Sequence, residues 1–441
     1  MSGGDGVGIV GGGLLGLTVG LRLAQAGVPV RVYERAEQLG GLVGSFDLDG
    51  YPADRFYHVV LPTDDRVIGL ARELGLGDRF RFQPTGVGFY DDGRLFSMSS
   101  LREFMSFPLL APHDRVRLAS FVARCQLVRD PAKLDDEPLL GWLRRQCGRR
   151  AVEALWRPLL DSKFDGRYDD LPASYIWART RRMSRTRDAS GRELMGWLEG
   201  GYQALVDALA ARLEALGARI ERGVAVERVL GTPGRVEGLV VDGREHRFDE
   251  VLCTLLPPAA SRLFDGPLAA ALPATPQRYL GVVCVILRVP ESVSPYYTLN
   301  ITDRRVPLTT VVESTHVVDP AAAGGTLLYV TRYVEPTSPD LDRPEDEVRN
   351  EYLGHARTIF PSLARTPILA ASVQRARVVE PVHPLGGASL LPPLHPLPGL
   401  TLASTLHVYP EVVNGQAVLG VAERAAAGLL ERVGTPQRVA A

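Results

Sequence analysis

The chain has 441 residues, which is too long for one simple core and predicts about two domains. Its 50 Lys and Arg are balanced by 51 Asp and Glu, so the charge predicts no general attraction to nucleic acid. Four cysteines without metal-ligand or dithiol spacing, and no apolar run of membrane-spanning length, lead us to expect a cytoplasmic protein by default.

The N-terminal segment has the pattern of a strand, a helix and a second strand. Val7–Val10 is a short apolar run typical of a buried strand. Leu14–Gln25 places its apolar residues at helical spacing, and Val28–Tyr33 is the second strand. Parallel strands need such a helix as a crossover, so we expect a βαβ unit.

Further elements follow in chain order and predict a discontinuous arrangement. We expect a helix over Arg66–Leu76, a hairpin over Val87–Phe96, a mostly helical Arg-rich region over Leu101–Leu198, a helix over Gly201–Leu216, short strands over Val224–Val251, strands over Tyr279–Val289 and Thr326–Tyr333, a helix over Glu345–Ile359, a strand over Leu400–Ser404 and a helix over Gly415–Arg432. We expect an FAD-binding domain from residues 1–95, 196–265 and 375–441. The substrate domain would comprise residues 96–195 and 266–374.

A glycine motif joins the first strand to the first helix. Gly11, Gly13 and Gly16 fit the pattern GxGxxG. The first glycine permits the tight turn, the second lets the backbone approach a pyrophosphate, and the third lets helix and strand pack closely. The helix then directs its first free amides, at Leu14 and Leu15, toward phosphate. The alternative is a glycine-rich turn that binds no ligand.

An acidic residue completes the motif. Glu34 ends the second strand, 18 residues after Gly16, where a ribose-binding carboxylate belongs. An acid at this position favours a free 2′-hydroxyl, and therefore FAD or NAD over NADP.

A second pair of glycines separates these two cofactors. The segment from Arg35 to Leu42 contains Gly40 and Gly41, and it resembles the second glycine signature of the FAD-dependent amine oxidase superfamily, which includes protoporphyrinogen oxidase and phytoene desaturase. The resemblance implies that Arg35, Gly40, Gly41 and Leu42 contact FAD. The family usually carries Arg directly after the glycine pair, where this chain has Leu42.

Two later segments carry the same resemblance. Gly200–Leu205 resembles the family's entry to a helix, and it leads to Val226, whose backbone would contact adenine. Leu402–Ser404 and Asn414–Gly420 resemble the closing flavin motif, in which a helix N-terminus stabilises negative charge on the reduced ring. The resemblance places four more residues at the flavin: Ser404, Gly415, Ala417 and Val418. An ordinary surface helix is the alternative.

The resemblance implies an α/β fold, with a Rossmann-type FAD-binding domain and a discontinuous mixed α+β substrate domain. The runs Asp54–His58 and Trp156–Phe164 look like a protoporphyrinogen-oxidase-like subgroup associated with bacterial cell-surface and natural-product pathways.

Three residues are candidates for catalysis. Tyr57 and His58 closely follow the second glycine motif, and His58 would serve as a general base with a pKa near neutrality. Lys163 and Lys133 are the two lysines among the 50 basic residues, and a buried Lys can lose its proton where Arg cannot. A structural histidine and a surface lysine are the corresponding alternatives.

Other features of the family pattern are incomplete. Amine oxidases place a Lys of the substrate-side sheet opposite flavin N5, whereas the corresponding residues 279–333 contain none, and Arg332 is the nearest basic candidate. Of the family's C-terminal aromatic cage we identify Tyr409, with His407 close by, and no second aromatic residue.

The remaining motifs each have a plainer explanation. The pairs Glu313/His316 and Glu380/His383 would need to converge to hold a metal, and we expect no metal site. The cluster Arg179–Arg187 could receive a phosphate or pyrophosphate, or be a solvated helical face. Phe104–Leu110 could touch a membrane or lipid, or pack in the core.

We therefore expect an FAD-dependent oxidase, dehydrogenase or desaturase that passes hydride from a small-molecule substrate to flavin N5, in a biosynthetic pathway. One alternative is a redox-neutral flavoenzyme resembling UDP-galactopyranose mutase. Another is a flavin-binding protein without catalysis. The substrate, the electron acceptor and the oligomeric state stay open.

Overall fold

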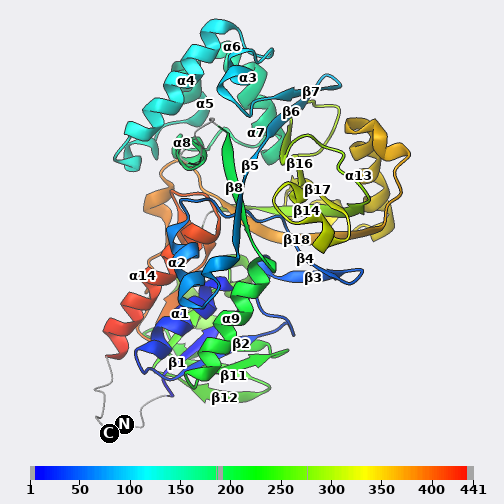
Figure 1. The fold of residues 1–441 in the computed structure, drawn as a ribbon. Helices are drawn as coiled ribbons and strands as arrows, with labels where there is room; N and C mark the ends of the chain where they lie inside the picture. The colour runs from blue at the N-terminus through cyan, green and yellow to red at the C-terminus, as the bar shows by residue number, and fades with distance from the viewer. Residues whose placement is uncertain (1–4, 185, 187–191, 276, 435–441) are drawn as a thin grey trace.

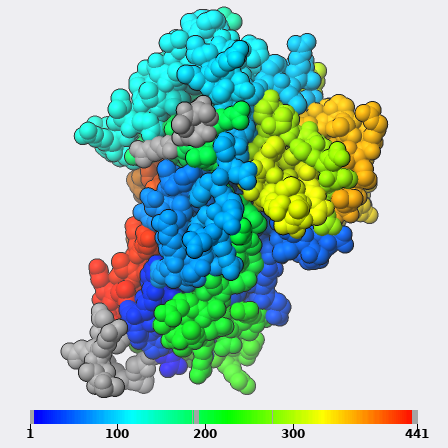
Figure 2. All heavy atoms as spheres, viewed as in Figure 1, coloured from blue at the N-terminus to red at the C-terminus, as the bar shows by residue number. Residues whose placement is uncertain are grey.

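A computed structural model describes residues 5–184, 186, 192–275 and 277–434. Figure 1 shows a small sheet with its covering helices at the lower end, a helical lobe at the upper end, and a larger mixed sheet beside and below the lobe. Figure 2 shows that the surfaces of these three parts meet without a gap on this face.

The small sheet is parallel and has the strand order β19-β13-β1-β2-β9. Its strands are β1 (Val7–Val10), β2 (Val30–Glu34), β9 (Arg219–Arg222), β13 (Glu250–Cys253) and β19 (Leu400–Leu402). Strand β1 is buried on both faces, as expected for the centre of a parallel sheet.

Different layers cover the two faces of this sheet. Ile9 and Val32 point into a core shared with α1 (Leu14–Gln25), α9 (Gly201–Ala215) and α14 (Gly415–Val433). Val10 and Tyr33, one residue along each strand, point to the opposite face, because side chains alternate along a strand. That face packs on an antiparallel meander of β10 (Val226–Thr232), β11 (Arg235–Val241) and β12 (Arg244–Arg247).

The larger sheet has seven strands in the order β18-β14-β17-β16-β15-β6-β7, and it is mixed because β15 and β6 pair in parallel. Its strands are β6 (Val87–Asp91), β7 (Arg94–Ser97), β14 (Arg278–Val289), β15 (Thr298–Ile301), β16 (Thr310–Glu313), β17 (Thr326–Val334) and β18 (Ala370–Val382). Helix α13 (Glu345–Ile359) covers the face that carries Val283 and Val285. Cys284 and Tyr329 point to the opposite face, toward the hairpin that follows the second glycine motif.

Short elements connect the strands of the two sheets. They are the hairpin β3 (Ser45–Leu48) and β4 (Tyr51–Asp54), the pair β5 (Phe80–Thr85) and β8 (Glu193–Leu198), and the helices α2 (Asp65–Glu73), α10 (Pro257–Ala260), α11 (Gly266–Ala270) and α12 (Pro320–Ala323). Helix α2 packs against α14, so the segment after the glycine motifs returns to the first domain.

The helical lobe has its own core. Its helices are α3 (Leu101–Met105), α4 (Pro112–Leu127), α5 (Leu139–Cys147), α6 (Arg149–Ala151), α7 (Arg157–Phe164) and α8 (Ser174–Met183). Phe107 and Leu110 are buried in this core, which favours the packing interpretation of Phe104–Leu110. Among the described residues, no helix combines the length and apolar character needed to cross a membrane.

Most predicted elements lie where the sequence places them, but several strands of the structure were not predicted, among them β3, β4, β5, β9, β15 and β16. Helices α1 and α13 have the predicted bounds. Residues 193–198 form strand β8 rather than helix, and β18 was not predicted at all. The division into two discontinuous domains stays a proposal. Strand β18 continues the large sheet past the expected boundary at residue 375, and β6 and β7 also belong to that sheet.

Candidate functional site

The glycine turn has the geometry of a phosphate cradle. Gly11 has φ +108°, a conformation that favours glycine, and a Cβ on Gly16 would collide with the Gly11 carbonyl oxygen. Gly13 differs, because the nearest heavy atom to a Cβ built there is the carbonyl oxygen of Gly40, at 3.8 Å. No side chain caps the N-terminus of α1, so the amides of Leu14 and Leu15 are available to a phosphate.

Glu34 lies directly beside this turn. Its Oε2 accepts a hydrogen bond from the Gly12 amide at 2.9 Å, and its Oε1 accepts from the Ala36 amide at 3.0 Å. The Glu34 carbonyl oxygen accepts a bond from the Val224 amide at 2.9 Å, two residues before Val226. The turn, the carboxylate and the segment leading to Val226 thus adjoin one another, as the pyrophosphate, ribose and adenine of a dinucleotide require.

The second glycine pair closes over the first. Gly13 and Gly40 form a β-bridge, and the Gly40 amide donates to the Gly12 carbonyl oxygen at 3.0 Å. Gly41 is exposed, and the nearest atom to a Cβ built on it is Gly13 Cα at 3.8 Å. Leu42 is half-buried and Arg35 is exposed, so the chain offers glycine backbone here rather than a buried arginine. These residues fit FAD, because the positions that a Cβ would take on Gly13 and Gly41 are both clear of close protein atoms.

The closing motif stands at the N-terminus of α14. Asn414 caps this helix by accepting from the Ala417 amide at 3.0 Å through its side chain, and from the Val418 amide at 3.0 Å through its carbonyl oxygen. Those two amides are therefore engaged within the helix, which leaves the amides of Gly415 and Gln416 as the donors at this terminus.

Ser404 occupies a different position. It is buried, and its hydroxyl caps the short turn that follows by accepting from the Leu406 amide at 3.4 Å. Its amide donates to His407 Nδ1 at 3.2 Å. Any contact from Ser404 to a flavin would therefore compete with these local bonds.

A pocket lined by aromatic residues follows the second glycine motif. Tyr57, His58 and Asp54 line it together with Tyr297 and Tyr329. Burial raises the pKa of Asp54 to about 7, although the Tyr202 amide donates to its carboxylate.

His58 lies in this pocket against the ring of Tyr202, with 5.4 Å between ring centroids. Its buried Nδ1 has no hydrogen-bond partner in the described part of the chain. Burial lowers the pKa of His58 to about 4 rather than leaving it near neutrality, so the ring is uncharged at physiological pH.

Lys163 forms the centre of a second cluster. Its Nζ lies 2.7 Å from Glu380 Oε2, and both side chains are nearly buried, at 8% and 14% exposed. Its Nζ also lies 4.2 Å from the centroid of the Tyr333 ring. Burial lowers the pKa of Lys163 to about 8, although the Glu380 charge acts in the opposite direction. Burial raises the pKa of Glu380, but the charges of Lys163 and Arg179 outweigh it and hold that pKa below its usual range.

This cluster lies between the two pockets. Tyr333 and Tyr57 share a side-chain hydrogen bond, and Tyr57 lines the aromatic pocket. Glu380 and Tyr175 line the other pocket, which also contains Val412 and Val413, just before the closing motif. The Lys163–Glu380 pair was missed because Glu380 lies 217 residues away, on the unpredicted strand β18.

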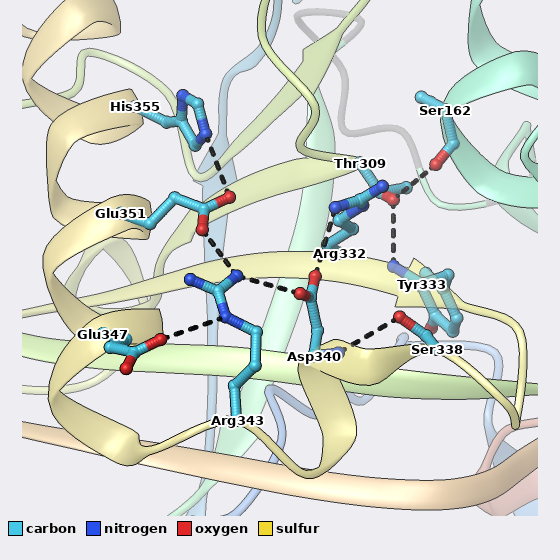
Figure 3. A network of polar contacts seen from close by, with 10 residues as sticks. All are labelled: Ser162, Thr309, Arg332, Tyr333, Ser338, Asp340, Arg343, Glu347, Glu351 and His355. Carbon is cyan, nitrogen blue, oxygen red and sulfur yellow. Dashed lines mark hydrogen bonds and ion pairs between the residues drawn. The ribbon is translucent and has the colours of Figure 1, made fainter.

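Arg332 does not belong to this site. Figure 3 shows that it points to Asp340, on the side of the sheet covered by α13, and the ion pair measures 3.2 Å. Arg343 also pairs with Asp340, at 3.0 Å. The proposal of Arg332 as the basic residue near the flavin is therefore wrong, because residues 331 and 333 face the other side of the strand.

Thr309 fixes the position of Lys163 relative to the large sheet. Its hydroxyl donates to the Ser162 carbonyl oxygen at 2.7 Å and accepts from the Tyr333 amide at 3.1 Å, as Figure 3 shows. One hydroxyl thus ties the end of α7 to β17, the strand that carries Tyr333.

We expect Thr309→Val to slow turnover several-fold while FAD stays bound. The valine keeps the shape of threonine but leaves two backbone groups without their partner, at a cost of about 1 kcal/mol each. Flavin reduction kinetics and urea unfolding measure the two effects. Thr358→Val is the matched control, because Thr358 is an exposed residue of α13 whose hydroxyl bonds only to the Gly354 carbonyl oxygen in the described chain. Equal turnover in both variants would contradict the positioning role.

In the structure, the ring of His383 lies beside Tyr409, a pairing that the sequence did not predict. The His383 ring lies 4.4 Å from the Tyr409 ring, and both line the pocket that contains Glu380. Tyr409 is held by Asp135 and by Ser174, whose hydroxyl lies 2.8 Å from the Tyr409 hydroxyl. Burial lowers the pKa of His383 to about 4, so this ring is also neutral.

His407 is buried outside this pair of rings. Its Nε2 lies 3.2 Å from the Pro392 carbonyl oxygen, and its Nδ1 accepts from the Ser404 amide. Both ring nitrogens are therefore engaged with backbone, which favours a structural role for His407.

The Glu313/His316 pair lies in the large sheet and the turn that follows it. His316 Nε2 lies 3.6 Å from Glu313, and Glu313 also accepts two backbone amides. Within residues 5–184, 186, 192–275 and 277–434, no three His, Cys, Asp or Glu side chains gather to hold a metal ion.

The arginines of the cluster Arg179–Arg187 point in different directions. Arg182 forms a bidentate ion pair with the buried Asp64, at 2.6 and 2.9 Å. Arg181 lies over the Trp177 ring, and Arg179 lies beside Tyr175. Arg185 and Arg187 lie outside the described residues.

Comparison with known proteins agrees with this geometry. Residues 16–427 match the family model described as flavin containing amine oxidoreductase. A coproporphyrinogen III oxidase of Mycobacterium tuberculosis is 28% identical over 288 residues, which cover 58% of this chain and 60% of the relative. The match thus spans less than two thirds of that relative's length.

Two solved structures share the fold. A putative protoporphyrinogen oxidase from Exiguobacterium sp. 255-15 superposes with a TM-score of 0.74 at 21% identity, over 98% of this chain and 99% of the other. A reduced UDP-galactopyranose mutase superposes with a TM-score of 0.72 at 14% identity, over 98% and 95%.

Proposed function

Because the chain belongs to the flavin containing amine oxidoreductase family and is an FAD-dependent oxidoreductase, we propose that it removes a hydride and a proton from a small-molecule substrate held beside the Lys163–Glu380 pair. FAD, when bound, would supply N5 as the hydride acceptor. The observation that carries the proposal is this buried pair, between a pocket that follows the glycine motif and a pocket that adjoins the closing motif.

We propose that FAD is held by backbone. The amides of Leu14 and Leu15 and the open faces of Gly13 and Gly41 would receive the pyrophosphate, with Gly11 and Gly16 shaping the turn. Glu34 would bind ribose and the backbone at Val226 would bind adenine. Arg35, Gly40 and Leu42 would contact FAD beside the first glycine turn. The proposed contacts at the flavin ring are Ser404, Gly415, Ala417 and Val418.

Lys163 is the proposed proton acceptor. Lys163 is mostly neutral when the pH exceeds its pKa of about 8. In this form Nζ can take the companion proton of the substrate. Glu380 then stabilises the ammonium, because it lies within ion-pair distance. Tyr57 and Tyr333 keep their protons, since burial raises the pKa of both hydroxyls. His58 would serve as a neutral hydrogen-bonding group over the pocket rather than as a titrating base.

We expect the rate of flavin reduction to rise as the pH passes through about 8, and Lys163→Met to remove this rise. A lowered pKa makes the lysine neutral within the measurable range, and methionine cannot accept a proton. The measurement is anaerobic stopped-flow bleaching of the flavin by coproporphyrinogen III, a primary amine and a carotenoid, each in turn. Lys133→Met, which replaces the other lysine, is the matched control. A pH profile that Lys163→Met leaves unchanged would contradict the role.

The redox-neutral alternative has one observation in its favour, the shared fold of the UDP-galactopyranose mutase. It predicts turnover of UDP-galactopyranose only after the flavin has been reduced chemically. Bleaching by a substrate without added reductant would instead support the hydride-transfer proposal. A folded protein that binds FAD but whose flavin is reduced by none of the candidate substrates, and that does not turn over UDP-galactopyranose, would favour the flavin-binding protein without catalysis.

A further inference from the structure

Arg179 is a cation without an ion pair next to the proposed reaction site. It lies on α8 and is exposed, whereas the three residues before it, Ile176, Trp177 and Ala178, are buried. Its Nη1 donates to the Tyr175 hydroxyl at 2.8 Å. Among the described residues, no carboxylate lies within ion-pair distance of its guanidinium, whereas Arg182 on the same helix is paired with Asp64.

The charges around Arg179 do not balance. While Lys163 is protonated, Lys163 and Arg179 contribute two positive charges and Glu380 contributes one negative charge, which leaves one positive charge. Once Lys163 is neutral, Arg179 still has no carboxylate of the described residues within ion-pair distance. Glu380 Oε2 is taken by Lys163 at 2.7 Å, and its Oε1 accepts the Tyr175 hydroxyl at 3.4 Å. Tyr175 is neutral, because burial raises its pKa. Because Arg179 is exposed and pairs with no carboxylate of the described residues, its guanidinium is free to bind the negative charge of a ligand.

The surplus charge borders both pockets. Tyr175 and Glu380 line the pocket beside the closing motif, and Tyr57, whose pKa responds to the Arg179 charge, lines the aromatic pocket. A guanidinium binds a carboxylate through two parallel hydrogen bonds, and a single surplus charge matches a monoanion. A protonated amine would be repelled at the same position.

We infer that Arg179 binds a carboxylate of the substrate, so that the substrate is an organic acid rather than an amine or a hydrocarbon. This assignment rests on the proposed function, because it places the substrate at the Lys163–Glu380 pair. Arg179 would anchor the acid group, while Lys163 receives the proton from the reacting part of the molecule.

The test uses the FAD-loaded protein and benzoate as the probe, with benzamide as an uncharged molecule of the same shape. Titration at constant ionic strength is followed by the change in visible flavin absorption. We expect benzoate to bind to the wild type, and Arg179→Gln to weaken it by about tenfold to a hundredfold, as for the loss of a charged hydrogen-bond pair. Arg181→Gln is the matched control on the same helix, because Arg181 contacts the Trp177 ring instead and its loss should leave benzoate binding unchanged.

Three results would overturn the inference. They are benzoate binding that Arg179→Gln leaves unchanged, benzamide or inorganic phosphate binding more tightly than benzoate, and a flavin spectrum of the wild type that benzoate does not alter. A failure of the proposed function, with the carboxylate-binding inference intact, would give another result. In that case benzoate binds in an Arg179-dependent manner, but no candidate substrate bleaches the flavin.

Discussion

Gly13→Val is expected to abolish FAD binding while leaving the protein folded. A Cβ at this position meets no protein atom closer than the Gly40 carbonyl oxygen at 3.8 Å, and the φ of −81° suits any residue. The valine methyl groups would therefore fill the space proposed for the pyrophosphate without disturbing the chain. We expect the FAD affinity to fall by about two orders of magnitude or more, since the phosphates lose several amide contacts at once.

The measurement is the visible flavin absorption per protein, with circular dichroism to follow folding. Gly354→Val is the matched control, because Gly354 is an exposed residue of α13 with no atom within 4 Å of a built Cβ. Gly16→Val provides the contrast, because its Cβ would strike the Gly11 backbone and the protein should lose its fold. Unchanged FAD affinity in Gly13→Val would place the cofactor elsewhere.

Glu380→Gln is expected to lower both stability and turnover. The substitution leaves the Lys163 ammonium nearly buried without its carboxylate, and breaking such a pair costs about 3–5 kcal/mol of unfolding free energy. It should also lower the pKa of Lys163 further, because the Glu380 charge opposes the effect of burial. Urea unfolding and the rate of flavin reduction measure the two effects.

The double variant Glu380→Gln/Lys163→Met separates structure from chemistry. With both charges removed, most of the lost stability should return, since a neutral pair leaves no buried charge unpaired. Turnover should stay low, because the proton acceptor is gone. A double variant with wild-type turnover would show that the pair only stabilises the fold.

The arrangement of the proposed dinucleotide site could be predicted from the sequence because its information is local. Strand β1, the glycine turn and α1 follow one another directly along the chain, and each glycine has a distinct steric reason. Glu34 could be placed because it ends the adjacent parallel strand, whose register brings its carboxylate to the Gly12 amide.

The substrate side could not be predicted in the same way. Strand β18 contains Gln374, Arg375 and Glu380, so it lacks the clear alternation of a half-buried strand. Period-2 alternation shows that Arg332 and Tyr333 face opposite sides, but not which side faces the flavin. The contact between Lys163 and Glu380 depends on the packing of α7 against the large sheet, which no local pattern encodes.

Titration of the flavin-free protein with FAD and with FMN tests the central claim most directly. FMN carries the flavin ring and one phosphate, but it lacks the adenine, its ribose and the second phosphate. We predict one FAD bound per chain and FMN binding weaker by at least about two orders of magnitude, because the glycine turn, Glu34 and the backbone at Val226 face the missing part. A folded protein that leaves FAD free, or binds FMN equally well, would contradict this account.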